Sequence, residues 1–377
     1  MSPEGFREPS VEGFQDVDKP WLRSADELEA GLTAWASRVV GPEAVARNVV
    51  APEGNGYSSE TVLLDLQRGP DQPTEAIVCR LAPLPSLYPV FPDYDLPLQQ
   101  RCMQLVARLT DVPVPTTPWC EEDPQWVGSP FLIMGRVDGL VPTDVPPYLF
   151  GGWVFDGTPE QHAKFQREAA RVLARLHDIT PEATDLSFLD RPEHGAAGID
   201  QHLGYQRWYY EWARGDERFG IIERTFEWLD THRPTHPNPT VLNWGDSRVG
   251  NMMWRDFEPV AVLDWEMAAL GPPEIDLAWM AFLHRFFQDI AERFEMPGLP
   301  DIMTTAGLAA DYEAEGGRPV RDVEWYEVFA ALRFAIVSVR TTARGIAYGQ
   351  SEKPADNDDY IMFRNLLEQM LDGSYWK

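Results

Sequence analysis

The sequence predicts an α+β fold with a small antiparallel β-sheet near the N-terminus and a larger, mainly α second part. Two patterns predict this division. Short segments rich in Val, Leu and Ile recur before residue 82 and are separated by turns that contain Gly or Pro. Long stretches with helical periodicity dominate after Gly139. The chain has 377 residues, 44% apolar and 24% charged, which is typical of a globular protein with room for two cores.

The first part is expected to begin with a helix over about residues 24–40. Ser24 and Glu27 have the spacing of a capping box, and apolar side chains follow at helical spacing. A Pro-rich link at 83–97 then leads into a second helix around 98–109. The strands expected to form the antiparallel sheet are 45–51, 60–66, 75–81, a run near Thr117, and 131–137.

The second part is expected to be mainly helical, with its polar loops in the middle. We predict an N-terminal lobe over residues 1–138 and a C-terminal lobe over 139–377. Between the helical stretches, short β-like runs alternate with polar residues over about 241–266, and loops on a rigid scaffold commonly carry function. The helices are expected at 159–179, 199–214, 219–231, 274–289 and 323–348.

Charge and cysteine content disfavour several classes of protein. The 32 basic and 60 acidic residues give a net charge of −28, which disfavours binding to nucleic acid or to an anionic membrane surface. Cys79, Cys102 and Cys120 form no C-x-x-C, so a reducing compartment fits best. Without a signal-like start or a bilayer-length apolar run, the chain is predicted to be cytoplasmic. Its oligomeric state is not determined by the sequence.

Three polar residues in the middle of the second part predict phosphoryl transfer. Asn251 follows Asp246 by five residues, and Asp264 comes after an apolar strand. Transfer from a nucleotide needs a group that orients the acceptor hydroxyl and oxygen ligands for Mg²⁺. Asp246 would accept the proton, and Asn251 and Asp264 would hold the metal. Arg248 could reach the transferring phosphoryl group. D-x-x-x-x-N alone also occurs by chance in loops that cap helices and close turns.

The surrounding segments carry a family resemblance. W-G-D-S-R-V-G-N-M-M-W and A-V-L-D-W-E-M-A-A-L-G-P-P-E-I-D-L-A-W together resemble the aminoglycoside phosphotransferase and choline kinase-like family. They are similar to the branch whose members are fused to, or encoded beside, acyl-CoA dehydrogenases. The resemblance implies a protein-kinase-like two-lobed fold, with ATP and Mg²⁺ as cofactors. It also implies phosphoryl transfer to a hydroxyl of a small molecule.

The resemblance assigns roles to the polar residues of the C-terminal lobe. Asp246 and Arg248 correspond to the catalytic Asp and the basic residue of its loop, and Asn251 and Asp264 correspond to metal ligands. Asp276 is similar to an Asp that supports the catalytic loop, and His177 is interpreted as a core residue. The sequence departs from the family at Trp244, where His is usual. Trp cannot accept a hydrogen bond or titrate, so it either anchors the loop or leaves Asp246 mispositioned.

The N-terminal lobe is expected to bind the nucleotide. In E-G-N-G-Y-S-S-E, Gly56, Ser58 and Ser59 could approach phosphate. A hairpin turn without a ligand explains this segment alone better, and only its order before the other motifs favours phosphate. Arg80 stands where kinases have the strand lysine that contacts phosphates. Gln99 and Gln100 stand where the partner Glu is usual, so a Gln could hydrogen-bond to Arg80 instead. Residues of the predicted hinge, otherwise a plain core strand, would border adenine: Met134, Gly135 and Val137.

The acceptor is left open by the sequence. Aminoglycosides, amino alcohols, sugars and hydroxyacyl compounds all fit, and the net charge gives a weak preference for a cationic or neutral acceptor. Alternative readings are a nucleotide-binding pseudoenzyme or regulatory module, favoured by the departures from the family pattern, and a metal-dependent hydrolase. Two groups could line an acceptor site or simply be a solvated face and core packing: acidic Asp144, Asp156, Glu211 and Asp216, and aromatic Tyr205, Trp208, Tyr209, Tyr210 and Trp212.

Overall fold

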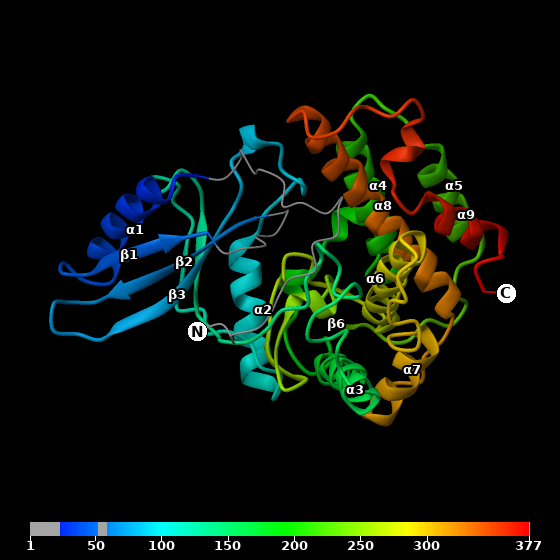
Figure 1. Cartoon of the computed structure of the whole chain (residues 1–377), viewed down its shortest axis with the longest axis horizontal. Coiled ribbons are helices and arrows are strands. Elements are labelled where there is room, and N and C mark those ends of the chain that lie inside the picture. Colours follow the sequence, from blue (N-terminus) through cyan, green and yellow to red (C-terminus); the bar gives the residue numbers. More distant parts are fainter. Residues whose placement is uncertain (1–22, 52–58, 377) are drawn as a thin grey trace.

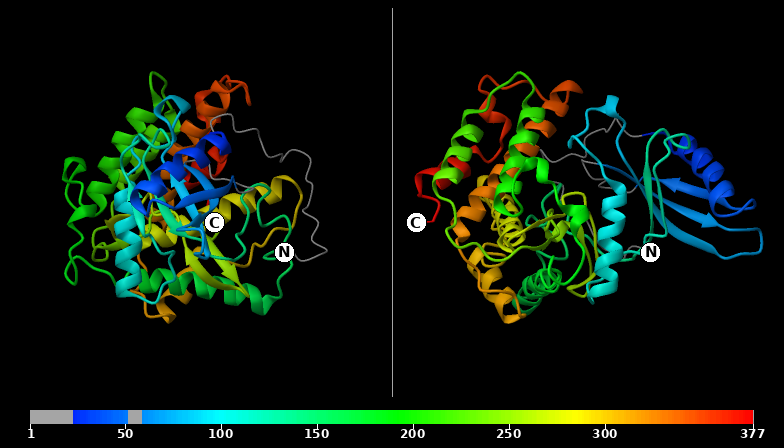
Figure 2. Two further views of the ribbon diagram at one scale, coloured as in Figure 1. Left: turned by 90° about the vertical axis from the view of Figure 1, so that its left-hand side faces the viewer. Right: turned by 180° about the vertical axis from the view of Figure 1, so that it is seen from behind.

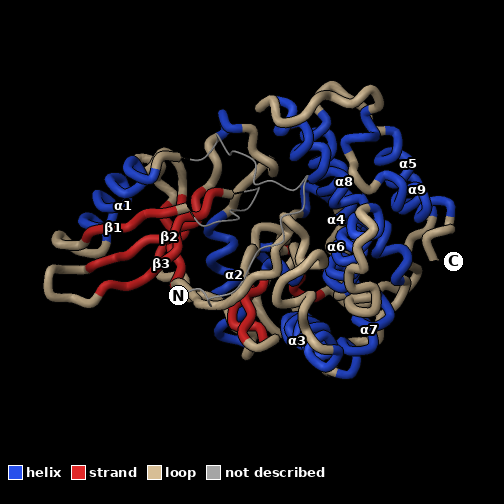
Figure 3. The backbone as a smooth tube through the Cα atoms, in the orientation of Figure 1, coloured by secondary structure: helices blue, strands red, loops and turns tan. Residues whose placement is uncertain are grey.

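The computed structural model describes residues 23–51 and 59–376. Strands gather in the first part and helices in the second, as predicted (Figure 1, Figure 3). The first part holds a five-stranded antiparallel sheet in the order β1-β2-β3-β5-β4. The predicted α+β class is confirmed. The strands are β1 (Val45–Val50), β2 (Glu60–Gln67), β3 (Thr74–Leu81), β4 (Trp119–Glu121) and β5 (Phe131–Gly135).

One face of the sheet is covered by α1 (Ala25–Val39). Alternate residues of a strand point to opposite faces, so β3 directs Ile77, Cys79 and Leu81 into the core shared with α1. The helix begins after Ser24, as predicted, but the Ser24 side chain makes no capping hydrogen bond, so the predicted capping box is wrong. The acidic first turn still complements the helix dipole.

The other face of the sheet belongs to the core of the second part. β5 directs Leu132 and Met134 toward α2 (Leu96–Leu109), and all three join the large core that continues into the C-terminal helices. Arg80 lies opposite Leu132 in the antiparallel pairing of β3 with β5, and so faces the same way. The sheet therefore presents Arg80 toward the second part of the molecule. The boundary at residue 138 remains a prediction.

The second part is built around α6 and α8, which pack against each other near the middle of the helical part (Figure 1). Seen from behind, α1 and the C-terminal helices lie at opposite ends of the molecule (Figure 2). Two helices here were not predicted from the sequence, α7 and α9. The helices are α3 (Pro159–Leu176), α4 (Ile199–Arg214), α5 (Gly220–Thr231), α6 (Glu274–Arg293), α7 (Thr305–Ala314), α8 (Val323–Ala347) and α9 (Arg364–Asp372).

Two small β-pairs position the polar loop between α5 and α6. β6 pairs with β9, β7 pairs with β8, and both pairs are antiparallel. Just beyond the second pair, the backbone N–H of Leu263 donates to the carbonyl of Asn251 at 2.8 Å. Asn251 and Asp264 therefore meet at one end of this hairpin. The strands are β6 (Val241–Asn243), β7 (Met252–Arg255), β8 (Glu258–Val262) and β9 (Ala269–Gly271). None of the helices described, in either part, is long and apolar enough to cross a membrane.

Candidate active site

The loop after β6 is held by one buried carboxylate, that of Asp276 at the start of α6. Its two oxygens accept hydrogen bonds from the backbone N–H groups of Trp244 at 2.8 Å and Gly245 at 2.9 Å. His177 Nε2 lies 3.1 Å from the same carboxylate. Burial alone would raise the pKa of Asp276, but the hydrogen bond with His177 and the N–H donors hold it below its usual value. Asp276 and His177 thus have the supporting and core positions expected of them.

Trp244 and Gly245 fix the path of the chain into Asp246. The Trp244 side chain is fully buried, and its Nε1 donates to the carbonyl of Leu263 at 2.8 Å, next to Asp264. Gly245 has φ of +92°, and a Cβ there would lie 2.0 Å from the carbonyl oxygen of Met267. Only glycine fits this position without a backbone shift. Of the two alternatives for Trp244, the structure favours the one in which it anchors the loop.

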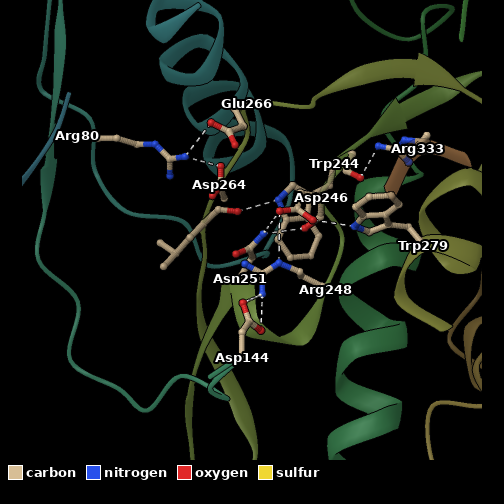
Figure 4. Close-up of polar contacts among 12 residues, drawn as sticks. Arg80, Asp144, Trp244, Asp246, Arg248, Asn251, Asp264, Glu266, Trp279 and Arg333 are labelled. Carbon is tan, nitrogen blue, oxygen red and sulfur yellow. Dashed lines mark hydrogen bonds and ion pairs between the residues drawn. The ribbon is translucent and has the colours of Figure 1, made fainter. Parts of the chain in front are cut away.

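The carboxylate of Asp246 is oriented by three donors. Trp279 Nε1, from α6, donates to Oδ1 at 2.7 Å, and Asn251 Nδ2 donates to Oδ2 at 2.7 Å (Figure 4). Arg248 Nε lies farther from Oδ2, at 3.4 Å. The side chain is 14% exposed, so one edge remains open to solvent. Such a carboxylate can accept a further hydrogen bond from a hydroxyl without losing its orientation.

Arg248 forms a close ion pair that the sequence did not predict. Its NH1 group lies 2.8 Å and 2.6 Å from the two carboxylate oxygens of Asp144, which belongs to the segment after the sheet (Figure 4). Burial alone would lower the pKa of Arg248, but Asp144 and Asp246 raise it above its usual value. Arg248 therefore stays charged beside Asp246. Asp144 holds this arginine and does not line the pocket described below.

Asn251 and Asp264 provide a few oxygen atoms that could coordinate a metal ion. The amide nitrogen of Asn251 is used by Asp246, so the amide oxygen is the atom left to accept from a ligand. Asp264 adopts φ of +59°, a left-handed conformation that sets its carboxylate apart from the strand before it. Within 23–51 and 59–376 no group of three or more His, Cys, Asp or Glu could hold a metal ion. One carboxylate and one amide fit Mg²⁺ bound mainly by nucleotide phosphates and water.

Arg80 reaches this site from the sheet. Its NH2 group lies 2.6 Å from Asp264 Oδ1 and 3.1 Å from Glu266 Oε2, so an ion pair connects β3 with the segment after β8 (Figure 4). Burial alone would lower the pKa of Arg80, but the two carboxylates raise it. The prediction that a Gln hydrogen-bonds with Arg80 is wrong. Gln100 donates to the carbonyl of Thr117, and Gln99 Nε2 is buried without a partner in the described chain.

The predicted nucleotide-binding residues are only partly placed by the structure. Met134 is buried and Val137 is half-buried at the end of β5, and the N–H of Gly135 donates to the carbonyl of Thr116. That N–H is thus already used, and the next one, of Arg136, donates to the carbonyl of Ala76 at 3.3 Å. Ser59 is buried at the start of β2. Gly56 and Ser58 lie outside the described residues.

A pocket of about 530 Å³ opens beside the polar loop. One wall is α4, another is the segment 91–95 before α2, and a third is the segment 266–269 that follows Asp264 and Trp265. Tyr205, Trp208 and Tyr209 of the predicted aromatic cluster line it. Tyr210 packs on Phe219 and Phe226 instead, and Trp212 contacts Arg340. Three of the five aromatic residues thus line a pocket, and their role as an acceptor wall stays a prediction.

The four acidic residues that were predicted as candidates for lining an acceptor site do not line this pocket. Besides Asp144, which pairs with Arg248, Glu211 pairs with Arg214 on the surface of α4. Asp156 and Asp216 are exposed. Sequence reasoning missed Glu266, Trp279 and Arg333, which surround the polar loop. Glu266 and Trp279 both lie inside the second of the two segments that carried the family resemblance, so only their contacts were unknown. Arg333 carries no local signal in α8.

The fold and the polar loop define a class of protein, that of kinase-like phosphotransferases with a two-lobed architecture. The match to a family is direct. The family model described as "Phosphotransferase enzyme family" (APH) matches residues 50–319, more than half of the chain. The chain belongs to this family, and the family and fold support phosphoryl transfer to a small molecule.

Solved structures share the fold across almost the whole chain. A candidate aminoglycoside phosphotransferase from Ralstonia eutropha superimposes with a TM-score of 0.60 at 22% identity, covering 90% of this chain and 96% of that one. Macrolide 2'-phosphotransferase MphH from Brachybacterium faecium gives 0.52 at 18% identity, covering 90% and 97%. A thermostable mutant of aminoglycoside phosphotransferase APH(4)-Ia, in a ternary complex with ADP and hygromycin B, gives 0.55 at 13% identity, covering 92% and 100%.

Similar sequences occur within larger proteins. Acyl-CoA dehydrogenase family member 10 of Mus musculus is 29% identical over 228 residues, which are 58% of this chain and 20% of that protein. The Arabidopsis thaliana protein named Probable acyl-CoA dehydrogenase IBR3 is 24% identical over 340 residues, which are 85% of this chain and 39% of that protein. The chain therefore spans less than half the length of these relatives. The predicted resemblance to the branch associated with acyl-CoA dehydrogenases is confirmed.

Proposed function

We propose that this protein transfers the γ-phosphoryl group of ATP to a hydroxyl of a small molecule in a reaction that requires Mg²⁺. One observation carries the proposal. Asp246 is held by Trp279 and Asn251 with one edge open, beside Asp264, to which Arg80 reaches across from the sheet. A proton acceptor, oxygen donors for a metal and a cation for phosphate are thus gathered in one place. Phosphoryl transfer depends mainly on positioning of these groups and on electrostatics.

Asp246 would orient the acceptor hydroxyl and take its proton as the bond to phosphorus forms. Because Trp279 and Asn251 each donate to one of its oxygens, the carboxylate keeps a fixed direction while the hydroxyl donates to it. The proton then resides on Asp246 until solvent removes it. This role needs a carboxylate that is ionised before the acceptor arrives.

The remaining polar side chains would bind the nucleotide. Asn251 Oδ1 and Asp264 would hold Mg²⁺, which when bound supplies charge neutralisation on the phosphate oxygens. Arg80 would exchange its carboxylate partners for the phosphates, since an arginine fork suits phosphate geometry. Arg248 would counter charge on the transferring group. Ser59 and, outside the described residues, Gly56 and Ser58 are proposed to contact phosphate, with Met134, Gly135 and Val137 beside the adenine.

The acceptor would enter through the pocket lined by Tyr205, Trp208 and Tyr209. Its third wall is the chain segment that continues directly from Asp264, so a molecule in the pocket lies next to the nucleotide side. Aromatic walls bury the carbon skeleton of an acceptor at small entropic cost because these side chains are stiff. A cytoplasmic location remains a prediction.

The experiment is a matched pair of substitutions, Asp246→Asn and Asp256→Asn. Asp256 lies in the turn of the neighbouring β7–β8 hairpin and is exposed, so its variant controls for charge and expression. ADP release would be measured with Mg²⁺, ATP and a panel of amino alcohols, sugars, aminoglycosides and hydroxyacyl thioesters. We expect Asp246→Asn to lower the rate at least ~100-fold, with ADP affinity retained, and Asp256→Asn to be unaffected. Nucleotide binding with no transfer by the unaltered protein would favour the regulatory alternative.

A further inference from the structure

One cation beside the polar loop makes no ion pair with any residue of 23–51 or 59–376, although the charges of Asp276 and Asp246 act on it from a distance. Arg333, on α8, is 3% exposed and lines the pocket. Its NH2 group donates to the carbonyl of Gly245 at 2.8 Å, and its guanidinium carbon lies 4.3 Å from the centre of the Trp279 ring. Its Nε and NH1 atoms are buried and find no hydrogen-bond partner among the described residues. Two of the three nitrogen atoms of a buried guanidinium are therefore unsatisfied.

A second unsatisfied polar side chain lines the same pocket. Gln206, on α4, is also 3% exposed, and its Oε1 atom is buried without a partner in the part of the chain described. One turn earlier on α4, His202 uses one ring nitrogen to contact the carbonyl of Leu270 at 3.1 Å. Since α4 and α8 pack against each other, these buried polar side chains line one pocket from two neighbouring helices.

Leaving these buried polar atoms without partners destabilises the folded protein when the pocket holds no ligand. A buried donor without a partner destabilises the folded state, and more strongly when the donor is charged. Burial lowers the pKa of Arg333 to about 10, which leaves it protonated at neutral pH. The carboxylates that line the pocket do not relieve it. Asp93 and Asp95 are exposed, the Glu193 side chain is 65% exposed, and Glu266 pairs with Arg80.

We propose that Arg333 binds an anionic oxygen group, a carboxylate or a phosphate, on the acceptor, so that the substrate is a hydroxylated anion. This inference rests on the proposed function, in which the pocket is the acceptor site. The group would accept hydrogen bonds from Nε and NH1, while Gln206 Oε1, an acceptor, would take a hydrogen bond from a donor elsewhere on the same ligand. Because Arg333 also holds the carbonyl of the residue before Asp246, the anion would lie close to the reacting hydroxyl. The net charge of the chain had suggested the opposite polarity.

The test compares three ligands that share one skeleton and differ in charge. Mandelate is anionic, mandelamide is neutral and 2-amino-1-phenylethanol is cationic, and each places a hydroxyl next to a phenyl ring. Binding would be measured by calorimetry in the presence of Mg²⁺ and a non-hydrolysable ATP analogue, which fills the proposed nucleotide site. Inorganic phosphate, titrated separately, distinguishes a phosphate site from a carboxylate site. We expect mandelate or phosphate to bind about 10- to 100-fold more tightly than mandelamide.

The matched variants are Arg333→Met and Arg340→Met. Arg340 lies two turns farther along α8, donates to the carbonyl of Pro89 and does not line the pocket. We expect Arg333→Met to remove the preference for anions and Arg340→Met to retain it. Gln206→Glu, which places a carboxylate in the pocket without removing Arg333, should weaken anion binding even if Arg333→Met does not fold.

Several outcomes would overturn the proposal. These are equal binding of all three ligands with no binding of phosphate, tightest binding of the cationic ligand, or unchanged anion affinity in both Arg333→Met and Gln206→Glu. The proposed function fails separately. If anions bind through Arg333 but no acceptor releases ADP, the anion site stands and phosphoryl transfer does not. If only cationic acceptors are phosphorylated, transfer stands and the anion site does not.

Discussion

Replacing Trp279 with Phe removes one hydrogen bond from Asp246 and little else. Trp279 Nε1 donates to Asp246 Oδ1 at 2.7 Å, and the indole ring also packs against Phe334 and beneath Arg333. A phenyl ring keeps much of this packing but has no N–H. Asp246 retains its hydrogen bond from Asn251 on the other oxygen, so the carboxylate is left free to turn about that contact.

The expected size of the effect follows from the charge on Asp246. A hydrogen bond to a charged group is worth about 1.5–3 kcal/mol. If that energy serves to hold Asp246 in the direction that the acceptor needs, its loss lowers kcat by about 10- to 150-fold. The KM for ATP should change little, because Trp279 contacts neither Arg80 nor Asp264 in the described structure.

The assay is steady-state ADP release with the best acceptor from the panel, and its control is Trp325→Phe. Trp325 Nε1 also donates a buried hydrogen bond, to the carbonyl of Leu229 at 3.0 Å, away from the polar loop. Both variants should lose some stability to urea, and only Trp279→Phe should lose kcat. A kcat for Trp279→Phe equal to that of Trp325→Phe would refute the claim that the indole orients Asp246.

Two further predictions concern the nucleotide and pH. Arg80→Met should weaken ADP binding about 10- to 100-fold in a fluorescence titration, while Arg136→Met, at an exposed site, should not; equal affinities would contradict the phosphate role. Burial lowers the pKa of His284 to about 4, against 6.5 ordinarily, so between pH 6.5 and 4 the unfolded chain binds the proton first. The free energy of unfolding should therefore fall as pH falls through this window, by roughly 1.4 kcal/mol per pH unit from this residue. Urea denaturation at pH 7, 6 and 5 should show a shallower pH dependence for His284→Gln, and an unchanged dependence would count against the assignment.

Most elements of the fold could be predicted from the sequence because local pattern determines them. The strands around 60–66 and 75–81 alternate or carry β-branched residues, and the helix over 199–214 has the bounds expected. The two helices that the sequence did not predict, α7 and α9, have weak patterns of apolar residues. α7 buries only Leu308 and Tyr312, and α9 has nine residues, so neither presents a long apolar stripe.

The residues at the centre of the candidate site could be named, but their partners could not. Asp246, Asn251 and Asp264 are close in sequence and lie on one loop and one hairpin. Arg80 meets Asp264 across 184 residues, and Arg248 meets Asp144 across 104. No local pattern encodes such pairs. The hydrogen bond expected between Arg80 and a Gln of α2 was wrong because Glu266 and Asp264 offer a stronger, charged alternative.

The hydrogen bonds of the buried Asp276 carboxylate constrain substitutions in some parts of the molecule and leave others free to change in sequence. It joins α3, α6 and the loop before Asp246 through His177, Trp244 and Gly245, so a change in any of these disturbs the others. The aromatic wall of the pocket on α4 makes none of these bonds. If the pocket takes the acceptor as proposed, substitutions there would alter which molecule is accepted while the loop around Asp246 is inherited unchanged. Such a division would let one scaffold acquire new substrates by a few mutations in a single helix.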